Sequence, residues 1–126
     1  MSDSQATKIL IIDDEKEICS LFKEFFMEEG CAVEVSYDGE DGIAKVKSFE
    51  PNIIIVDHRM PIMDGSQVIR TVRESFSTPI ICVSAFTNQD SIDECLKLGA
   101  NDYLAKPIIL EDLMDKVQAC IDKLEK

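Results

Sequence analysis

The sequence predicts an α/β domain in which five parallel strands alternate with five helices. Short runs rich in β-branched residues alternate with longer segments whose apolar residues recur every three or four positions. Two of the short runs, 8–12 and 53–56, are almost continuously apolar, as expected for strands that helices cover on both faces. Repeated strand–helix alternation indicates a doubly wound parallel sheet. The length of 126 residues suits one domain, which we expect to span residues 1–126.

The first strand (8–12) and the helix after it show the clearest patterns. Apolar residues recur at helical spacing in this helix: Ile18, Leu21, Phe22, Phe25 and Phe26. Gly30 ends the helix, because glycine readily takes the left-handed conformation that closes helices. Residues 32–36 then alternate between apolar and polar side chains, which predicts a strand at the edge of the sheet.

The middle of the chain contains the predicted central strand. A turn at Asp38-Gly39 begins the second helix, which runs to about residue 49 and is broken by Pro51. The apolar run 53–56 is the central strand and ends on Asp57. The segment 60–65, Met-Pro-Ile-Met-Asp-Gly, is too irregular for a helix or strand and is expected to be a loop. The third helix buries Val68, Ile69 and Val72.

The last third of the chain completes the alternation. It comprises a fourth strand (79–83) ending at Ser84-Ala85, a helix (89–98) capped by Gly99, a short strand (102–105), a Lys106-Pro107 turn, and a final helix. The final helix uses the apolar residues Leu110, Leu113, Val117, Ile121 and Leu124.

Composition excludes several classes of protein. The formal net charge is −12, which disfavours direct binding to nucleic acid or to an anionic membrane surface. No apolar run approaches the ~20 residues of a membrane-spanning helix, and the N-terminus lacks a secretory signal. The five cysteines include no Cys-x-x-Cys spacing, so we expect free thiols in a reducing cytoplasm rather than a zinc site or a disulfide framework.

Polar residues gather where the predicted strands end. Asp13 and Asp14 follow the first strand, Asp57 ends the third, Ser84 ends the fourth and Lys106 follows the fifth. With the strand order 2-1-3-4-5, these ends are neighbours at the edge of the sheet where such folds bind ligands. Taken singly, each residue has an ordinary structural explanation: helix capping for the acidic pair, a turn for Asp57, and a solvated charge for the lysine.

The combination indicates a metal-assisted phosphoryl site. Three carboxylates that lie close together repel one another, and a hard cation such as Mg²⁺ would relieve that repulsion. A lysine and a hydroxyl facing the cation would hold oxygens of a phosphoryl group. We therefore expect Asp57 to accept or contact such a group.

These residues resemble the receiver domain of two-component response regulators, over the whole chain. The resemblance is carried by Asp13-Asp14, by the stretch from Asp57 to Gly65 (Asp-His-Arg-Met-Pro-Ile-Met-Asp-Gly), by Ser84-Ala85, by Tyr103 and by Lys106-Pro107. It implies a flavodoxin-like (βα)5 fold, a phosphoacceptor at Asp57, and a cis peptide bond before Pro107.

The resemblance also implies a set of roles around Asp57. Asp14 and Asp57 would bind Mg²⁺ directly, Asp13 mostly through water, and the backbone carbonyl of Arg59 would be a further ligand. Lys106 would pair with the phosphoryl group, while Ser84 and Tyr103 would form the switch. The donor would be a phosphohistidine on a sensor histidine kinase or a histidine phosphotransfer protein.

Two further expectations concern the fate of the phosphoryl group and the output. Arg59 and Phe86 flank the site and cannot orient a water as a carboxylate or amide would, which predicts slow autodephosphorylation. The output face of helix four, strand five and helix five is mixed in charge, so the sequence identifies no downstream protein. The chain is a stand-alone receiver, similar to a chemotaxis regulator, or a receiver from a longer transcriptional or enzymatic regulator.

Two other classes of function fit the sequence less well. A phosphohydrolase with an aspartyl nucleophile typically has a second aspartate two residues later, where this chain has Arg59, and it usually needs a cap domain. A flavin-binding domain would need a small, hydroxyl-rich phosphate loop after the first strand, where Asp13 and Asp14 would repel the phosphate. His58, the only histidine, is given no role in the site.

Overall fold

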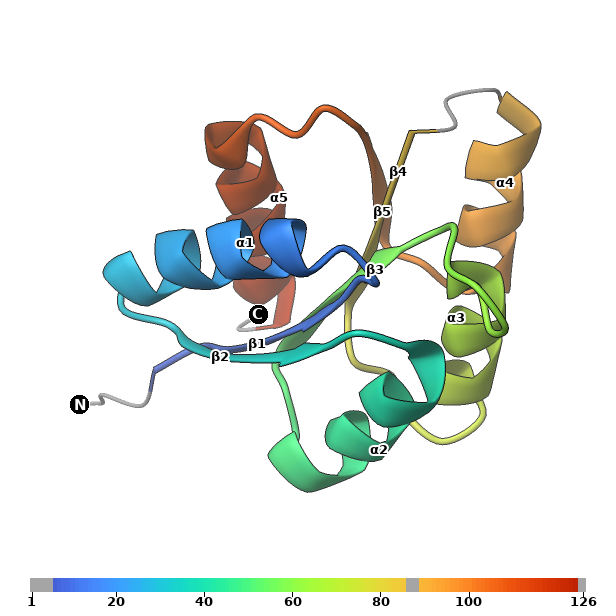
Figure 1. The fold of residues 1–126 in the computed structure, drawn as a ribbon, viewed down its shortest axis with the longest axis horizontal. Coiled ribbons are helices and arrows are strands. Elements are labelled where there is room, and N and C mark those ends of the chain that lie inside the picture. Colours follow the sequence, from blue (N-terminus) through green and yellow to red (C-terminus); the bar gives the residue numbers. More distant parts are fainter. Residues whose placement is uncertain (1–5, 86–88, 125–126) are drawn as a thin grey trace.

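The computed structural model describes residues 6–85 and 89–124. Its elements alternate strictly along the chain: β1 (Lys8–Ile12), α1 (Lys16–Glu28), β2 (Ala32–Ser36), α2 (Gly39–Phe49), β3 (Ile53–Asp57), α3 (Gly65–Arg73), β4 (Ile80–Ser84), α4 (Gln89–Leu98), β5 (Asp102–Ala105) and α5 (Leu110–Leu124). All the strand pairs are parallel and the order is β2-β1-β3-β4-β5, which confirms the predicted fold class and strand order (Figure 1).

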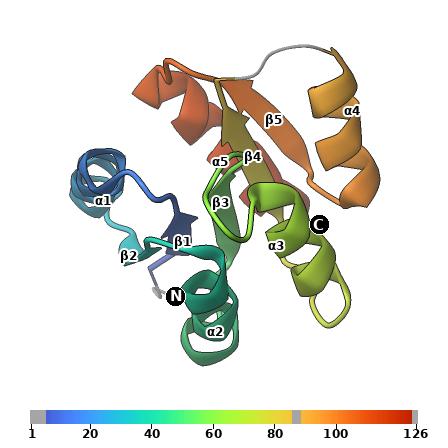
Figure 2. The same cartoon turned by 45° about the vertical axis from the view of Figure 1, so that its right-hand side comes forward.

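Two layers of helices cover the sheet (Figures 1 and 2). Helices α2, α3 and α4 pack on one face, where Leu10, Ile54 and Val68 belong to a single buried cluster. Helices α1 and α5 pack on the other face, where the buried cluster contains Phe22 and Val117. Strands β1, β3 and β4 lie inside the sheet and bury nearly every side chain, because helices cover both of their faces.

The predicted apolar stripe of α1 is wrong at one position. Leu21 was expected to face inward, but it is 47% exposed, while Cys19 is buried. The buried stripe is Cys19, Phe22 and Phe26, and Leu21 lies about 100° around the helix from Phe22. The apolar character of Leu21 therefore gave no information about the direction of its side chain.

The other predicted boundaries agree with the structure to within one or two residues. Strand β4 begins at Ile80 rather than at Pro79, because a proline has no N–H to donate to the ladder, although the Pro79 carbonyl accepts from Ile54 N. Gly30 and Gly99 have positive φ at the ends of α1 and α4, and the Lys106-Pro107 bond is cis as expected. Among the described residues, no helix is both long and apolar enough to cross a membrane.

Candidate phosphoacceptor site

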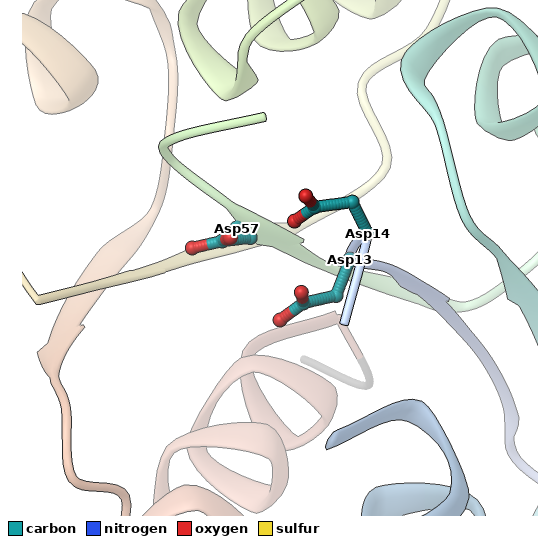
Figure 3. Close-up of side chains that lie close together, drawn as sticks. All are labelled: Asp13, Asp14 and Asp57. Carbon is teal, nitrogen blue, oxygen red and sulfur yellow. The ribbon is translucent and has the colours of Figure 1, made fainter. Parts of the chain in front are cut away.

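Three carboxylates meet at the carboxyl ends of β1 and β3. Asp13 and Asp14 directly follow β1, and Asp57 is the last residue of β3. Because β1 and β3 are adjacent parallel strands with Ile12 paired to Val56, their ends lie side by side. One carboxylate oxygen from each aspartate lies within 4.8 Å of the others (Figure 3). Asp13 and Asp57 are buried and Asp14 is exposed, so the cluster opens to solvent on one side.

The acidic pair does not cap α1. Glu15 is the N-cap residue, and its side chain makes no capping hydrogen bond. The Asp13 carboxylate instead accepts a hydrogen bond from the Glu15 backbone N–H at 2.9 Å, which fixes it at the entry to the cluster. The structure thus favours the site over helix capping as the explanation of these two aspartates.

Lys106 brings a positive charge into the cluster from the end of β5. Its Nζ lies 3.4 Å from Asp13 Oδ2, 3.4 Å from Asp57 Oδ1 and 3.1 Å from Glu15 Oε1. The Lys106 side chain is only 16% exposed. Burial alone would lower the pKa of Lys106, but the negative charges of Asp13 and Asp57 outweigh it and raise the pKa. The ammonium therefore stays charged throughout the physiological pH range.

The lysine does not fully compensate the carboxylates. Burial, reinforced by the charge of Asp13 and opposed by Lys106, raises the pKa of Asp57 to about 6. Burial also raises the pKa of Asp13, against the Glu15 hydrogen bond and the Lys106 charge. The site thus holds more negative charge than it can stabilise by itself. Oxygen ligands with uncompensated charge suit a hard divalent cation, so the three aspartates could bind a metal ion.

Ser84 and Tyr103 lie beside the cluster. Ser84 is the last residue of β4, is fully buried, and follows Val83, the register partner of Asp57. Tyr103 is half-buried on β5. Burial raises the pKa of the Tyr103 hydroxyl, and a hydrogen bond with Ser84 opposes that shift. The serine and the tyrosine therefore interact with each other in this structure, and their joint role as a switch stays a prediction.

The β3–α3 loop packs tightly against the site. The backbone N–H of Gly65 donates to the His58 carbonyl at 2.9 Å, and Gly65 has no room for a side chain. A Cβ there would overlap the Asp57 carbonyl oxygen and lie 2.8 Å from His58 Cα. In the same loop Ile62 is fully exposed and has a φ of 70°, a conformation that strains a β-branched residue. Arg59 is exposed, and the metal role of its carbonyl remains a prediction.

Sequence reasoning missed two contacts of the site. Glu15 is the third carboxylate partner of Lys106. Its place in the acidic run 13–15 after β1 was the signal that could have identified this contact. His58 is buried, and its Nε2 lies 3.1 Å from Ser66 Oγ and 3.6 Å from Glu94 Oε1. It therefore links the end of β3 to α3 and α4, a relation that strand-end spacing does not reveal. Phe86 lies outside the described residues.

Comparison with known proteins agrees with the fold and the site. The response regulator receiver domain family matches residues 9–118. A two-component response regulator from Clostridium difficile is 32% identical, with 95% of this chain and 99% of that chain covered and a TM-score of 0.92. The receiver domain of the Francisella response regulator 1452 is 30% identical, with coverages of 94% and 98% and a TM-score of 0.89. A CheY-like receiver domain protein from Methanospirillum hungatei JF-1 is 26% identical, with coverages of 96% and 98% and a TM-score of 0.91.

The fold and the acidic edge of its sheet define a signalling phosphoacceptor domain. The chain belongs to the response regulator receiver domain family. The Asp13, Asp14 and Asp57 pocket is typical of the phosphoacceptor site of this family. Membership implies two-component signal transduction and a cognate histidine kinase as partner.

Proposed function

We propose that Asp57 accepts a phosphoryl group from a phosphohistidine on a sensor histidine kinase or a histidine phosphotransfer protein, in the cytoplasm and with Mg²⁺. The observation that carries this proposal is the buried Asp57 carboxylate, which has Asp13, Asp14 and Lys106 around it. The whole of residues 1–126 is proposed to act as one receiver domain, which the family match over 9–118 supports.

The donor set favours Mg²⁺ among hard cations. Mg²⁺ is usually held by one or two carboxylates together with waters and substrate phosphate, and it neutralises charge on a transferring phosphoryl group. Asp14 and Asp57 would supply direct ligands, Asp13 a ligand through water, and the Arg59 backbone carbonyl a further oxygen. The raised pKa of Asp57 supports this assignment, because burial and the charge of Asp13 disfavour the ionised carboxylate and a bound cation would offset both effects.

In the transfer step, an Asp57 carboxylate oxygen forms a bond to phosphorus as the phosphorus–nitrogen bond of the donor breaks. The electron pair of that bond leaves on the imidazole nitrogen of the donor. With a pKa of about 6, Asp57 is largely ionised at pH 7 and is able to attack. Lys106, 3.4 Å from Asp57 Oδ1, is positioned to pair with the phosphoryl oxygens.

The new phosphoryl group would act on Ser84 and Tyr103. The phosphoryl group carries a charge of roughly −2, in place of the single charge of the Asp57 carboxylate, and brings strong acceptor oxygens. Ser84 would turn toward these oxygens and release Tyr103 from their present hydrogen bond, so that Tyr103 packs inward behind it. Because the two states differ in these contacts, phosphorylation shifts the equilibrium between the inactive and active conformations.

The chain is proposed to catalyse its own phosphorylation and dephosphorylation, with no external substrate to turn over. Arg59 follows Asp57 by two residues and Phe86 follows Ser84 by two residues in the sequence, and neither side chain has the carboxylate or amide that would orient a water for attack on the acyl phosphate. Slow loss of the phosphoryl group is the expected result. A half-life of seconds for the purified phosphoprotein, without any phosphatase, would contradict this expectation.

The first experiment is phosphorylation of the purified chain by acetyl phosphate, followed by intact mass. We expect one phosphoryl group per chain with Mg²⁺ and none with EDTA. Asp57→Asn should abolish incorporation, whereas Asp115→Asn, a control on the exposed surface of α5, should leave it unchanged. Phosphotransfer from each histidine kinase of the same genome then identifies the donor. Incorporation into the Asp57→Asn variant at the wild-type level would refute the assigned acceptor.

A further inference from the structure

Two buried thiols face each other between β4 and α4. Cys82 lies in β4 and Cys95 in α4, and neither side chain is exposed to solvent. Their Sγ atoms are 3.2 Å apart, within hydrogen-bonding contact. Both belong to the apolar cluster under α2, α3 and α4, and both are free cysteines. A bond between them needs an approach of about 1.2 Å, since bonded sulfurs lie ~2.05 Å apart.

The environment of this pair differs from that of the other thiols. Cys19 donates to the Asp13 carbonyl, and Cys31 and Cys120 are half-buried on α1–β2 and α5. In the pair, the hydrogen bond between the two thiols lowers the pKa of Cys95, against the effect of burial. Cys95 is therefore the thiol of the pair that ionises more readily, and thiolate is the form that reacts with oxidants.

The two cysteines are neighbours of the proposed switch residues Ser84 and Tyr103 in the sheet. Cys82 is two residues before Ser84 on β4, so the two side chains point to the same face of the sheet. Cys82 is also the register partner of Tyr103 on β5. A covalent bond from Cys82 to Cys95 would thus fasten α4 to the sheet beside both Ser84 and Tyr103.

We propose that Cys82 and Cys95 are an oxidation site, whose disulfide anchors α4 to β4 and holds the Ser84–Tyr103 region in its present arrangement. The existence of this site stands on the geometry of the two thiols. Its consequence for signalling rests on the proposed function, because it presumes that phosphorylation at Asp57 rearranges this region.

Hydrogen peroxide is an oxidant small enough for a buried pair. The Cys95 thiolate attacks one peroxide oxygen, the O–O bond breaks, and Cys95 becomes a sulfenic acid with hydroxide as the leaving group. The Cys82 thiolate then attacks the Cys95 sulfur and displaces the second hydroxide. The hydroxides take up the two thiol protons, so two thiols and one peroxide give one disulfide and two waters. Because both thiols are buried, oxidation proceeds through transient opening of α4.

The site is tested on the intact chain by peroxide oxidation, alkylation of the remaining thiols after unfolding, and peptide mass mapping. We expect a linked peptide pair containing Cys82 and Cys95, lighter by two hydrogens, which dithiothreitol separates. Cys95→Ala should abolish the link, while the matched control Cys120→Ala should retain it. The thermal midpoint of the oxidised chain should rise by about 5–10 °C, because the crosslink restricts the unfolded chain. The rise is modest because the loop that the crosslink closes is short. If both residues remain alkylatable while the other thiols are oxidised, the site is refuted.

The consequence for switching is tested by hydrogen exchange of α4 with and without acetyl phosphate. Oxidation leaves the acidic cluster intact, so both forms should take up the phosphoryl group. Phosphorylation should change exchange in α4 of the reduced chain by several-fold, and this change should disappear on oxidation and return with dithiothreitol. An equal change in both forms would refute the anchoring role. If the reduced chain takes up no phosphoryl group, the proposed function fails, whereas the linked peptide still decides the oxidation site.

Discussion

Replacement of Asp57 by asparagine is expected to stabilise the metal-free protein. The Asp57 carboxylate is buried beside Asp13, and its pKa is raised from an ordinary value near 3.8 to about 6. The folded chain therefore binds a proton at Asp57 more tightly than the unfolded chain does. Since the carboxylate is ionised at pH 7, the folded state carries an unfavourable charge that asparagine, which has nearly the same shape, removes.

The size of the effect follows from the two pKa values. A pKa raised from 3.8 to about 6 corresponds to ~3 kcal/mol of free energy by which the fold disfavours the ionised form. Well below the unfolded-state pKa of 3.8 both states are protonated and this cost is absent. Stability is lost as pH rises from about 4 to about 6, and the full cost remains above that range. Asp57→Asn should thus exceed the wild type by about 3 kcal/mol at pH 7 and converge with it near pH 4.

Urea unfolding in EDTA between pH 4 and pH 8 measures this difference. The control is Asp115→Asn, which removes an exposed carboxylate and should change stability by less than ~0.5 kcal/mol. Millimolar Mg²⁺ should raise the wild-type midpoint more than that of Asp57→Asn, because the metal relieves the same repulsion. If Asp57→Asn is no more stable than the wild type at pH 7 without metal, the electrostatic description of the site is incorrect.

Three further substitutions test the surroundings of the site. Gly65→Ala should lower the free energy of unfolding by more than ~2 kcal/mol and impair phosphorylation, because the added Cβ overlaps the backbone at the end of β3. The control Gly30→Ala, whose Cβ meets no other atom, should lower the free energy of unfolding by only ~1 kcal/mol and leave phosphorylation intact. Ile62→Asn should raise the free energy of unfolding by ~1 kcal/mol by relieving the strain at φ 70°, whereas Ile62→Val, which keeps a β-branched side chain at the same φ, should not. Lys106→Met should lower stability by ~2 kcal/mol in EDTA at pH 7, with a larger gain from Mg²⁺ than in the wild type. Urea unfolding and acetyl phosphate labelling check all three substitutions. Equal losses of stability in the two glycine variants would contradict the steric reason, and equal gains of stability in the two isoleucine variants would contradict the strain. A lysine variant as stable as the wild type would contradict the charge pairing.

The fold and the position of the acidic cluster could be predicted because each depends on local order in the sequence. The continuous apolar run of β3 can be buried on both faces only in a central parallel strand, and parallel strands bring their carboxyl ends together. Asp13, Asp14 and Asp57 were therefore placed in one site by chain order alone, and the structure gathers them there.

The remaining features depend on side-chain direction and on packing between distant segments. Leu21 and Cys19 are both compatible with an apolar helix face, and only packing against the sheet determines which of them is buried. The contact between Cys82 and Cys95 depends on the rotation of α4, which hydrophobic spacing defines too coarsely to bring two particular atoms together. The positive φ of Ile62 is a backbone property of the β3–α3 loop, and an isoleucine in the sequence gives no sign of it.

The most direct test of the central claim is chemical mapping of the phosphoryl group. The chain is labelled with acetyl phosphate and Mg²⁺, reduced with sodium borohydride, and digested for mass analysis. An aspartyl phosphate is reduced to homoserine, and we expect homoserine at position 57 and unchanged aspartate at positions 13 and 14. Homoserine at position 13 or 14, or a labelled chain whose residue 57 is still aspartate, would contradict the assignment of Asp57 as the phosphoacceptor.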